Sequence, residues 1–365
     1  MMPRLTILLG AGGVGKTTLS TALGLALARA GGKAALLSID PARRLRSALG
    51  LADVPEHGIR VPTLGSAGSL DAALLDPGAS LRRWVADDCR DDAMRARLLV
   101  NPYFLALADR LAGLTDAIGC ARAVEWAERD PALGELVLDT APGLAAVELL
   151  ARPDKLMAFF DGRLIRWIVR LARFGGAGLA GMGHRMLSGI SELSGTHLLR
   201  EFGGLLSAVD EAVATMIARL ERARTWLKAP STSLVIVCGV SDDSREVARG
   251  LDECLRALSF GPTLVVLNRV LPEALATLAP PGATAPAEAR AFLRYVQSYL
   301  AAQARVRAQL EGEFARVIDI PDGLPDAAAQ ATATRLDALA ALGEPLRRAL
   351  DEPVQAARLV ALHGR

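Results

Sequence analysis

The 365-residue sequence is poor in aromatic residues, in cysteine and in net charge. Aromatic residues make up 4% of the chain and the formal net charge is +2. Neither base-stacking platforms nor a basic surface for nucleic acid is therefore expected. The cysteines are scattered without a CxxC pair, so we expect no zinc and interpret them as buried thiols in a reducing compartment. They are Cys89, Cys120, Cys238 and Cys254.

Long hydrophobic runs are also missing. A membrane-spanning helix needs about 18 uninterrupted apolar residues, and the nearest stretch, 156–172, is broken by one aspartate and three arginines. The apolar run 5–9 is too short for a signal peptide, and glycines follow it at once. These absences predict a cytoplasmic location.

The sequence is rich in short apolar runs, several of which end at glycine, aspartate or asparagine. A helical stretch rich in alanine and leucine, 16–30, follows the first run and is closed by Gly31 and Gly32. Apolar strands that alternate with helices are typical of parallel sheets covered on both faces. We therefore predict an α/β fold with a doubly wound, mostly parallel sheet of about seven to eight strands. The expected strands are residues 6–9, 34–39, 59–64, 136–138, 234–237, 264–267 and 317–320.

Two longer stretches, 81–129 and 154–228, have a helical period and no strand between their helices. Within the second, the glycine-rich run 174–183 is a poor helix and predicts a flexible connector or a tight packing point. We interpret both stretches as an α-helical subdomain inserted around the fourth strand. This subdomain is expected to bind a client or partner. The sheet-containing core would then comprise 1–80, 130–153 and 229–345, and 346–365 would form a C-terminal helix and tail.

The first strand and helix enclose a motif with known chemistry. The run GAGGVGKTT fits GxxxxGK[ST] in the strand–loop–helix context that a phosphate-binding loop, or P-loop, requires. Backbone N–H groups and the helix N-terminus would hold the phosphates of ATP, Lys16 would reach the β- and γ-phosphates, and Thr17 would bind Mg²⁺. The fold is thus expected to be of the P-loop NTPase type. The residues of this predicted nucleotide site are Gly10, Ala11, Gly12, Gly13, Val14, Gly15, Lys16, Thr17 and Thr18.

Two aspartates end predicted strands at the sheet edge where ligands of α/β folds bind. Asp40, in SIDPARRL, is positioned to orient and deprotonate the water that attacks the γ-phosphate, and to sit near the metal. Its alternative role is a helix N-cap before Pro41. Asp139, in LVLDTAP, is expected to hold magnesium directly or through water, unless it too is a cap. The predicted metal ligands are thus Thr17, Asp40 and Asp139.

Asn268 follows the apolar run 264–267. An asparagine amide can pair with both donor and acceptor groups on adenine. An ordinary loop asparagine is the alternative interpretation.

In this order along the chain, the motifs resemble those of one family, the arsenite-pump and tail-anchored-protein-targeting ATPases of the deviant-Walker class. GAGGVGKTT resembles the GKGGVGKTT of that family, SIDPARRL its STDPAHxL, and LVLDTAP the start of its DTAPTGH. VVLNRVLPE is similar to its adenine-recognition strand, and DIPDGLPD lies where the family has a proline-containing loop over the base. The resemblance covers most of the chain.

The resemblance implies roles for particular residues. Asp40 would be the base for the attacking water, with Lys16 the second catalytic residue, and Asp139 the magnesium-side carboxylate. Asn268 with Arg269 would contact adenine, and Pro321 would lie in the loop over the base. The family works as a dimer that ATP closes and hydrolysis opens, which reshapes a hydrophobic groove for a client or membrane protein. A homodimer and a heterodimer with a paralogous ATPase both remain open.

The departures from the family pattern concern turnover. The second lysine of the family, which reaches the partner's phosphates, is replaced by Ala11, and Gly143, Leu144 and Ala145 replace its Thr-Gly-His. Hydrolysis is therefore expected to be slow or partner-dependent, because a cationic donor to the developing charge is missing. A non-hydrolysing nucleotide-dependent binding module and a P-loop kinase or ligase are the alternatives. The arsenite-binding cysteines are not recognisable, which argues against arsenite transport.

Apolar residues of the stretch 156–171 recur at helical spacing beside Arg163, Arg166, Arg170 and Arg173. Three interpretations are open: a core helix with a solvated face, a hydrophobic client groove, and a helix on an anionic membrane surface.

Overall fold

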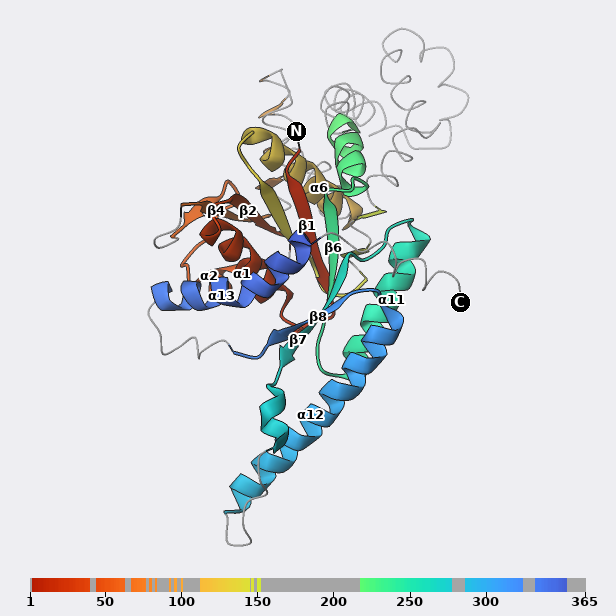
Figure 1. The fold of residues 1–365 in the computed structure, drawn as a ribbon. Coiled ribbons are helices and arrows are strands. Elements are labelled where there is room, and N and C mark those ends of the chain that lie inside the picture. Colours follow the sequence, from red (N-terminus) through yellow and green to blue (C-terminus); the bar gives the residue numbers. More distant parts are fainter. Residues whose placement is uncertain are drawn as a thin grey trace, which may run out of the picture. The chain divides into compact units, whose positions relative to one another are not determined.

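The computed structural model (Figure 1) divides the chain into two compact units, which are described separately here. The first unit contains Met1–Leu75, Ala127–Glu148 and Trp226–Arg365, and the second contains Asp76–Trp126 and Leu149–Thr225. None of the described helices combines the length and apolarity that crossing a membrane requires. The structure describes residues 2–39, 44–62, 67–76, 112–144, 217–277, 286–323 and 332–352, with single positions between 79 and 151.

An eight-stranded sheet forms the centre of the first unit, in the order β3-β4-β2-β5-β1-β6-β7-β8. All neighbouring strands are parallel except β3, which runs antiparallel to β4 at one edge. This topology confirms the predicted α/β fold. The strands are β1 (Arg4–Gly10), β2 (Lys33–Ser38), β3 (Ile59–Val61), β4 (Ser69–Leu74), β5 (Glu135–Asp139), β6 (Thr232–Cys238), β7 (Leu264–Val270) and β8 (Val317–Pro321).

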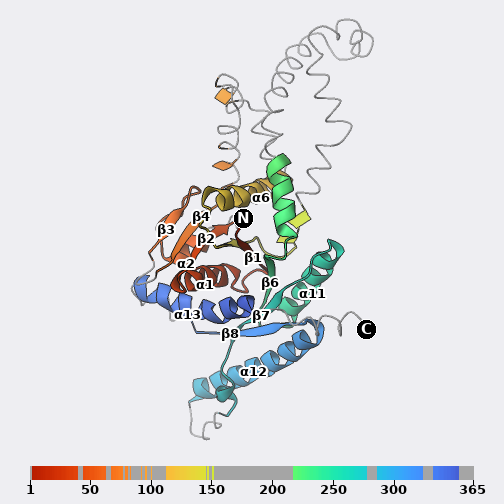
Figure 2. The same cartoon turned by 45° about the horizontal axis from the view of Figure 1, so that its top comes forward.

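Helices cover both faces of this sheet. The chain adds strands on both sides of β1, and because crossovers are right-handed, strands added in opposite directions place their connecting helices on opposite faces. α1 and α13 lie side by side on one face (Figure 2), and α11 and α12 follow from the crossovers on the other. The described helices are α1 (Lys16–Arg29), α2 (Arg44–Leu49), α6 (Ala112–Arg129), α11 (Asp242–Ala257), the 3₁₀ helix η1 (Glu273–Thr277), α12 (Ala287–Glu313) and α13 (Thr332–Asp351).

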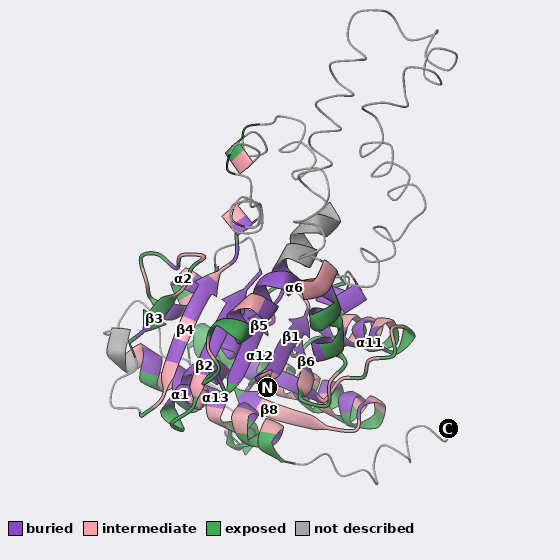
Figure 3. Cartoon of the chain, turned by 90° about the horizontal axis from the view of Figure 1, so that it is seen from above, coloured by how far each residue is buried: buried purple, intermediate pink, exposed green. Residues whose placement is uncertain are grey.

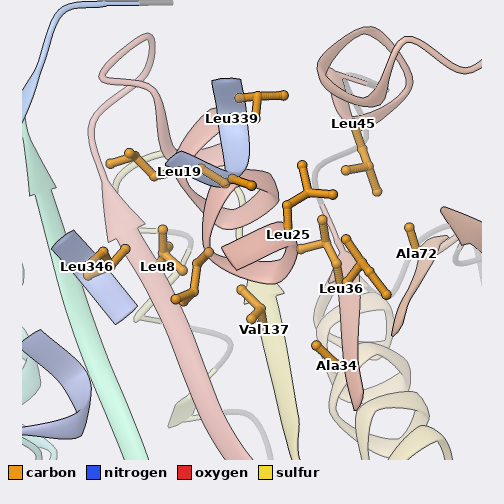
Figure 4. Close-up of a cluster of buried hydrophobic side chains, with 14 of the residues drawn as sticks. Leu8, Leu19, Leu25, Ala34, Leu36, Leu45, Ala72, Val137, Leu339 and Leu346 are labelled. Carbon is orange, nitrogen blue, oxygen red and sulfur yellow. The ribbon is translucent and has the colours of Figure 1, made fainter. Parts of the chain in front are cut away.

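The core lies between the sheet and the α1–α13 layer. Central strands are buried along most of their length (Figure 3), as expected for a parallel sheet covered on both faces. Leu8 and Val137 of the sheet, Leu19 of α1, and Leu339 and Leu346 of α13 belong to one cluster of buried side chains (Figure 4). Because α1 begins at the P-loop, this packing fixes the helix whose N-terminus faces the nucleotide site.

Glycine allows α13 to approach α1 closely. A Cβ atom at Gly343 would lie 2.1 Å from the carbonyl oxygen of Ala22. Only a residue without a side chain fits there, so the two helices pack backbone against backbone.

Some sequence-based boundaries were wrong. The strand expected at 59–64 is the three-residue edge strand β3. Strand β4 was missed because SLDAAL carries an aspartate that interrupts its apolar run. The helix expected from 346 begins at Thr332 and continues through Pro345. The glycine-rich run 174–183 and the stretch 156–171 lie outside the described residues.

Candidate nucleotide-binding site

The P-loop joins the carboxyl end of β1 to the start of α1. Gly13 and Gly15 have φ values of 79° and 96°, a backbone region that other residues rarely adopt. At Gly10 a Cβ atom would lie 2.4 Å from the carbonyl oxygen of Val237 on the neighbouring strand β6. Glycine is therefore needed for the shape of the loop at three positions, for two different reasons.

Lys16 is the first residue of α1 and is 5% exposed. Its Nζ donates hydrogen bonds to the carbonyl oxygens of Gly10 (3.0 Å) and Ala11 (2.9 Å). The ammonium group is thus held against the first residues of its own loop. A phosphate bound in the loop would supply stronger, charge-assisted acceptors for the same ammonium group.

Asp139, the last residue of β5, is fully buried at 0% exposure. Its Oδ2 accepts hydrogen bonds from Thr17 Oγ1 (2.8 Å) and Ser38 Oγ (2.9 Å), and its Oδ1 accepts one from Ser20 Oγ (3.3 Å). The structure therefore brings together the predicted magnesium residues Thr17 and Asp139, which are 122 positions apart. Asp40, the third predicted metal ligand and the predicted base, lies outside the described residues.

Ser20 and Ser38 are not among the site residues predicted from the sequence. Ser20 lies one helical turn after Lys16, and Ser38 ends β2 directly beside Asp139 in the strand register. Both signals were present in the sequence: the i+4 spacing after the P-loop lysine, and a hydroxyl at the end of an apolar strand.

The oxygen donors around Asp139 suit a hard cation. Carboxylate and hydroxyl oxygens are the ligands that Mg²⁺ prefers, and Mg²⁺ at nucleotide sites uses one or two carboxylates together with water and substrate phosphates. Among the described residues no group of three or more His, Cys, Asp or Glu side chains could hold a metal. The residues present therefore fit a magnesium ion bound together with phosphate, and they do not form an all-protein metal cage.

The segment after β5 is tied to the strand that leads into the P-loop. Thr140 Oγ1 donates to the carbonyl oxygen of Leu8 (2.6 Å). The backbone N–H of Gly143 donates to the carbonyl oxygen of Gly10 (2.9 Å). Leu144, which stands where the family has glycine, is 56% exposed. The segment after β5 is thus hydrogen-bonded to both the last part of β1 and the first residue of the P-loop.

Asn268 lies on the other side of the P-loop. It is 5% exposed, and its Nδ2 donates to the carbonyl oxygen of Val14 (2.7 Å). The missing side chain of Gly15 makes room for it, since a Cβ there would lie 2.4 Å from Nδ2. The amide still has a second N–H and an oxygen acceptor, which leaves adenine recognition by Asn268 as a prediction.

Arg269 and Pro321, the other predicted base-side residues, lie on adjacent strands. Arg269 has a φ of 63° and sits at a bulge in the pairing of β7 with β8. Beyond the bulge Val270 pairs with Pro321, and the N–H of Asp322 donates to the carbonyl oxygen of Val270 (3.0 Å). The end of β8 thus supports the chain just after Asn268.

The cysteines lie apart from this chemistry. Burial raises the pKa of the Cys238 thiol, against the opposing effect of its contact with Ser244. Cys120 is buried and Cys254 is partly exposed. Cys89 lies outside the described residues.

Comparison with known proteins gives one family. Residues 3–300 match the sequence profile of a family described as anion-transporting ATPase. The chain is 31% identical to the ATPase Get3 of Aspergillus terreus over 148 residues, which is 40% of this chain and 42% of that protein.

Longer but weaker matches extend over most of this chain. It is 26% identical over 297 residues to the ATPase ARSA1 of Chlamydomonas reinhardtii, covering 72% of this chain and 34% of that protein. It is 27% identical over 289 residues to an uncharacterised protein of Streptomyces coelicolor, covering 74% of this chain and 63% of that protein. The chain thus matches less than two thirds of the length of each of these relatives.

Proposed function

Because this chain belongs to the anion-transporting ATPase family, we propose that it is an ATP- and magnesium-dependent ATPase that works as a dimeric switch. The observation that carries the proposal is the contact between the P-loop hydroxyl of Thr17 and the buried carboxylate of Asp139, at 2.8 Å. Among P-loop proteins this pair of groups belongs to the magnesium site beside the β- and γ-phosphates.

Each part of the site has a defined task in this proposal. The backbone N–H groups of the loop bind the phosphates, and Lys16 turns from the loop carbonyls to the phosphate oxygens. Thr17 and Asp139 would hold the ion, which neutralises charge on the phosphates when bound. Ser20 and Ser38 fix the carboxylate of Asp139 through hydrogen bonds.

Turnover depends on two further positions. Asp40 orients and deprotonates the attacking water. Ala11 leaves the site without the second lysine, and the loss of one such donor raises a barrier by about 3 kcal/mol. We therefore propose slow or partner-dependent hydrolysis, with a paralogue that retains the lysine as one form of the dimer.

The proposal also assigns the client-binding subdomain, the ATPase core and the residues beside the base. Residues 81–129 and 154–228 form the subdomain that binds a hydrophobic client or membrane protein, and the ATPase core comprises 1–80, 130–153 and 229–345. Asn268, Arg269 and Pro321 lie on the base side of the nucleotide. The protein acts in the cytoplasm, without zinc and without nucleic acid.

ATP binding and steady-state hydrolysis of four proteins test the proposal. The wild type should turn over faster than Lys16→Ala and Asp40→Asn. Lys16→Ala should also bind ATP more weakly, whereas Asp40→Asn should retain binding. Lys33→Ala is the matched control, because Lys33 pairs with Asp130 at the amino end of β2 and should leave both quantities unchanged. Absence of ATP binding by the wild type would refute the proposal.

A non-hydrolysing binding module is the second candidate, and Ala11 is the residue that favours it. It is supported if the wild type binds ATP but hydrolyses it no faster than either active-site variant. Sedimentation with ATP and magnesium tests the dimer, with and without candidate partners. A monomer under all these conditions contradicts the dimeric switch.

A further inference from the structure

Helix α12 holds the backbone of the segment that follows Asn268. The side chain of Gln303, which is 4% exposed, makes two hydrogen bonds to one residue of this segment. Its Oε1 accepts from the N–H of Leu271 (2.8 Å) and its Nε2 donates to the carbonyl oxygen of Leu271 (3.0 Å). This pairing satisfies both backbone groups of a residue that lies beyond the regular pairing of β7.

A second contact comes from the preceding turn of the same helix. Tyr299, four residues before Gln303 and therefore on the same face, donates from its hydroxyl to the carbonyl oxygen of Arg269 (2.7 Å). Partial burial raises the pKa of the Tyr299 phenol, in keeping with a hydroxyl that donates to a carbonyl oxygen. Together the two side chains fix the backbone of 269–271 from one side.

The segment needs such support because its backbone is unfavourable. Arg269 adopts a positive φ of 63°, which non-glycine residues avoid unless the surrounding structure enforces it. On its other sides the segment is joined to β8 through Val270 and to the P-loop through Asn268. Hydrogen bonds at both ends of the segment 268–271, joined by its backbone, thus connect α12 to the P-loop.

We propose that Gln303 and Tyr299 are positioning residues that set the base selectivity of the nucleotide site. They hold residues 269–271 so that the amide of Asn268 and the adjoining backbone face the base in one orientation. A site that pairs with specific hydrogen-bonding groups rejects a base that lacks them, because its own buried groups are then left unpaired. The proposal rests on the assignment of Asn268 to the adenine side of the proposed nucleotide site.

The clamp acts at the base end of the nucleotide. Its contacts involve α12, β7 and the residue just after β7, whereas the P-loop lies between β1 and α1, with Gly10 ending β1 and Lys16 beginning α1. Loosening it should therefore weaken recognition of the base and leave the grip on the phosphates.

The test compares the dissociation constants of ATP, GTP and inorganic tripolyphosphate, each with magnesium, for the full chain. Gln303→Leu should weaken ATP binding about tenfold, which corresponds to about 1.4 kcal/mol. Its ATP-to-GTP preference should fall at least about threefold, and tripolyphosphate binding should change by less than about twofold. Tyr299→Phe should show the same pattern with a smaller amplitude. Gln297→Leu, on an exposed position of the same helix, is the matched control and should change nothing.

An independent measurement reports the clamp itself. Amide hydrogen exchange at Leu271 should accelerate in Gln303→Leu and not in Gln297→Leu, with no nucleotide present.

Three results would overturn the inference. These are an unchanged ATP-to-GTP preference in both clamp variants, an equal loss of ATP and tripolyphosphate binding, and unaltered exchange at Leu271. Failure of the wild type to bind ATP refutes the proposed function and with it this inference. ATP binding by the wild type with no effect of the clamp variants on selectivity refutes the inference alone.

Discussion

Replacing Gly343 by alanine should destabilise the protein by forcing α13 away from the P-loop helix. A Cβ at this position would lie 2.1 Å from the oxygen and 2.3 Å from the carbon of the Ala22 carbonyl, and 2.7 Å from the nitrogen of Leu23. All three atoms belong to the backbone of α1, so no side-chain rotation relieves the overlap. One of the two helices must move.

The size of the effect follows from these distances. Ordinary contact begins near 3.4 Å, so the helices must separate by about 1.3 Å, an overpacking that costs about 1–3 kcal/mol. Separation also loosens the packing of Leu339 and Leu346, two side chains of α13 that are almost completely buried. Alanine is better than glycine in a helix by about 1 kcal/mol, which offsets part of the loss. A net loss of about 1 kcal/mol in the free energy of unfolding is expected.

Urea denaturation monitored by circular dichroism measures this loss as a lower midpoint with an unchanged slope. Gly250→Ala is the matched control, because Gly250 lies within α11 and a Cβ there would meet nothing within 4 Å. That variant should be more stable than the wild type by up to about 1 kcal/mol. The reasoning is refuted if Gly343→Ala is as stable as the wild type while Gly250→Ala is stabilised as expected.

Three further predictions concern the site and the pH dependence. Gly15→Ala should weaken ATP binding more than Gly13→Ala, because both have a positive φ but only the first would collide with the buried asparagine of β7; equal losses by titration would contradict this. Ser38→Ala should weaken the magnesium dependence of ATP binding by about 1 kcal/mol, since a buried carboxylate loses a hydrogen bond, and an unchanged magnesium titration would exclude that role. The third prediction concerns Glu344, whose hydrogen-bonded ion pairs with Arg347 and Arg348 lower its pKa to about 2. Its contribution is therefore present above pH ~4.5, is lost as the pH falls towards 2, and is under about 1 kcal/mol because the side chain is partly exposed. Burial raises the pKa of Glu135, so Glu135→Gln should instead remove a loss of stability that appears as the pH rises above ~4.5; urea midpoints across pH 2–8 separate the two signs.

Local features of the chain were predictable from the sequence. The P-loop was located because its glycines and lysine must follow one another at fixed spacing between a strand and a helix. The buried strands were located because a sheet covered on both faces requires continuous apolar runs. Strand β4 escaped detection because Asp71 interrupts its apolar run. Helix α13 was misplaced because Pro345 lies inside a helix that packing against α1 stabilises.

The sequence by itself determined the strand–loop–helix of the phosphate site, the α/β class and the family to which the chain belongs, since these depend on neighbouring residues. Only the tertiary structure decided which distant side chains meet. Ser38 reaches Asp139 across 101 positions, and Asn268 reaches the P-loop across 254. The clamp of Gln303 on Leu271 and the close approach at Gly343 likewise depend on how strands and helices pack, which no local periodicity encodes.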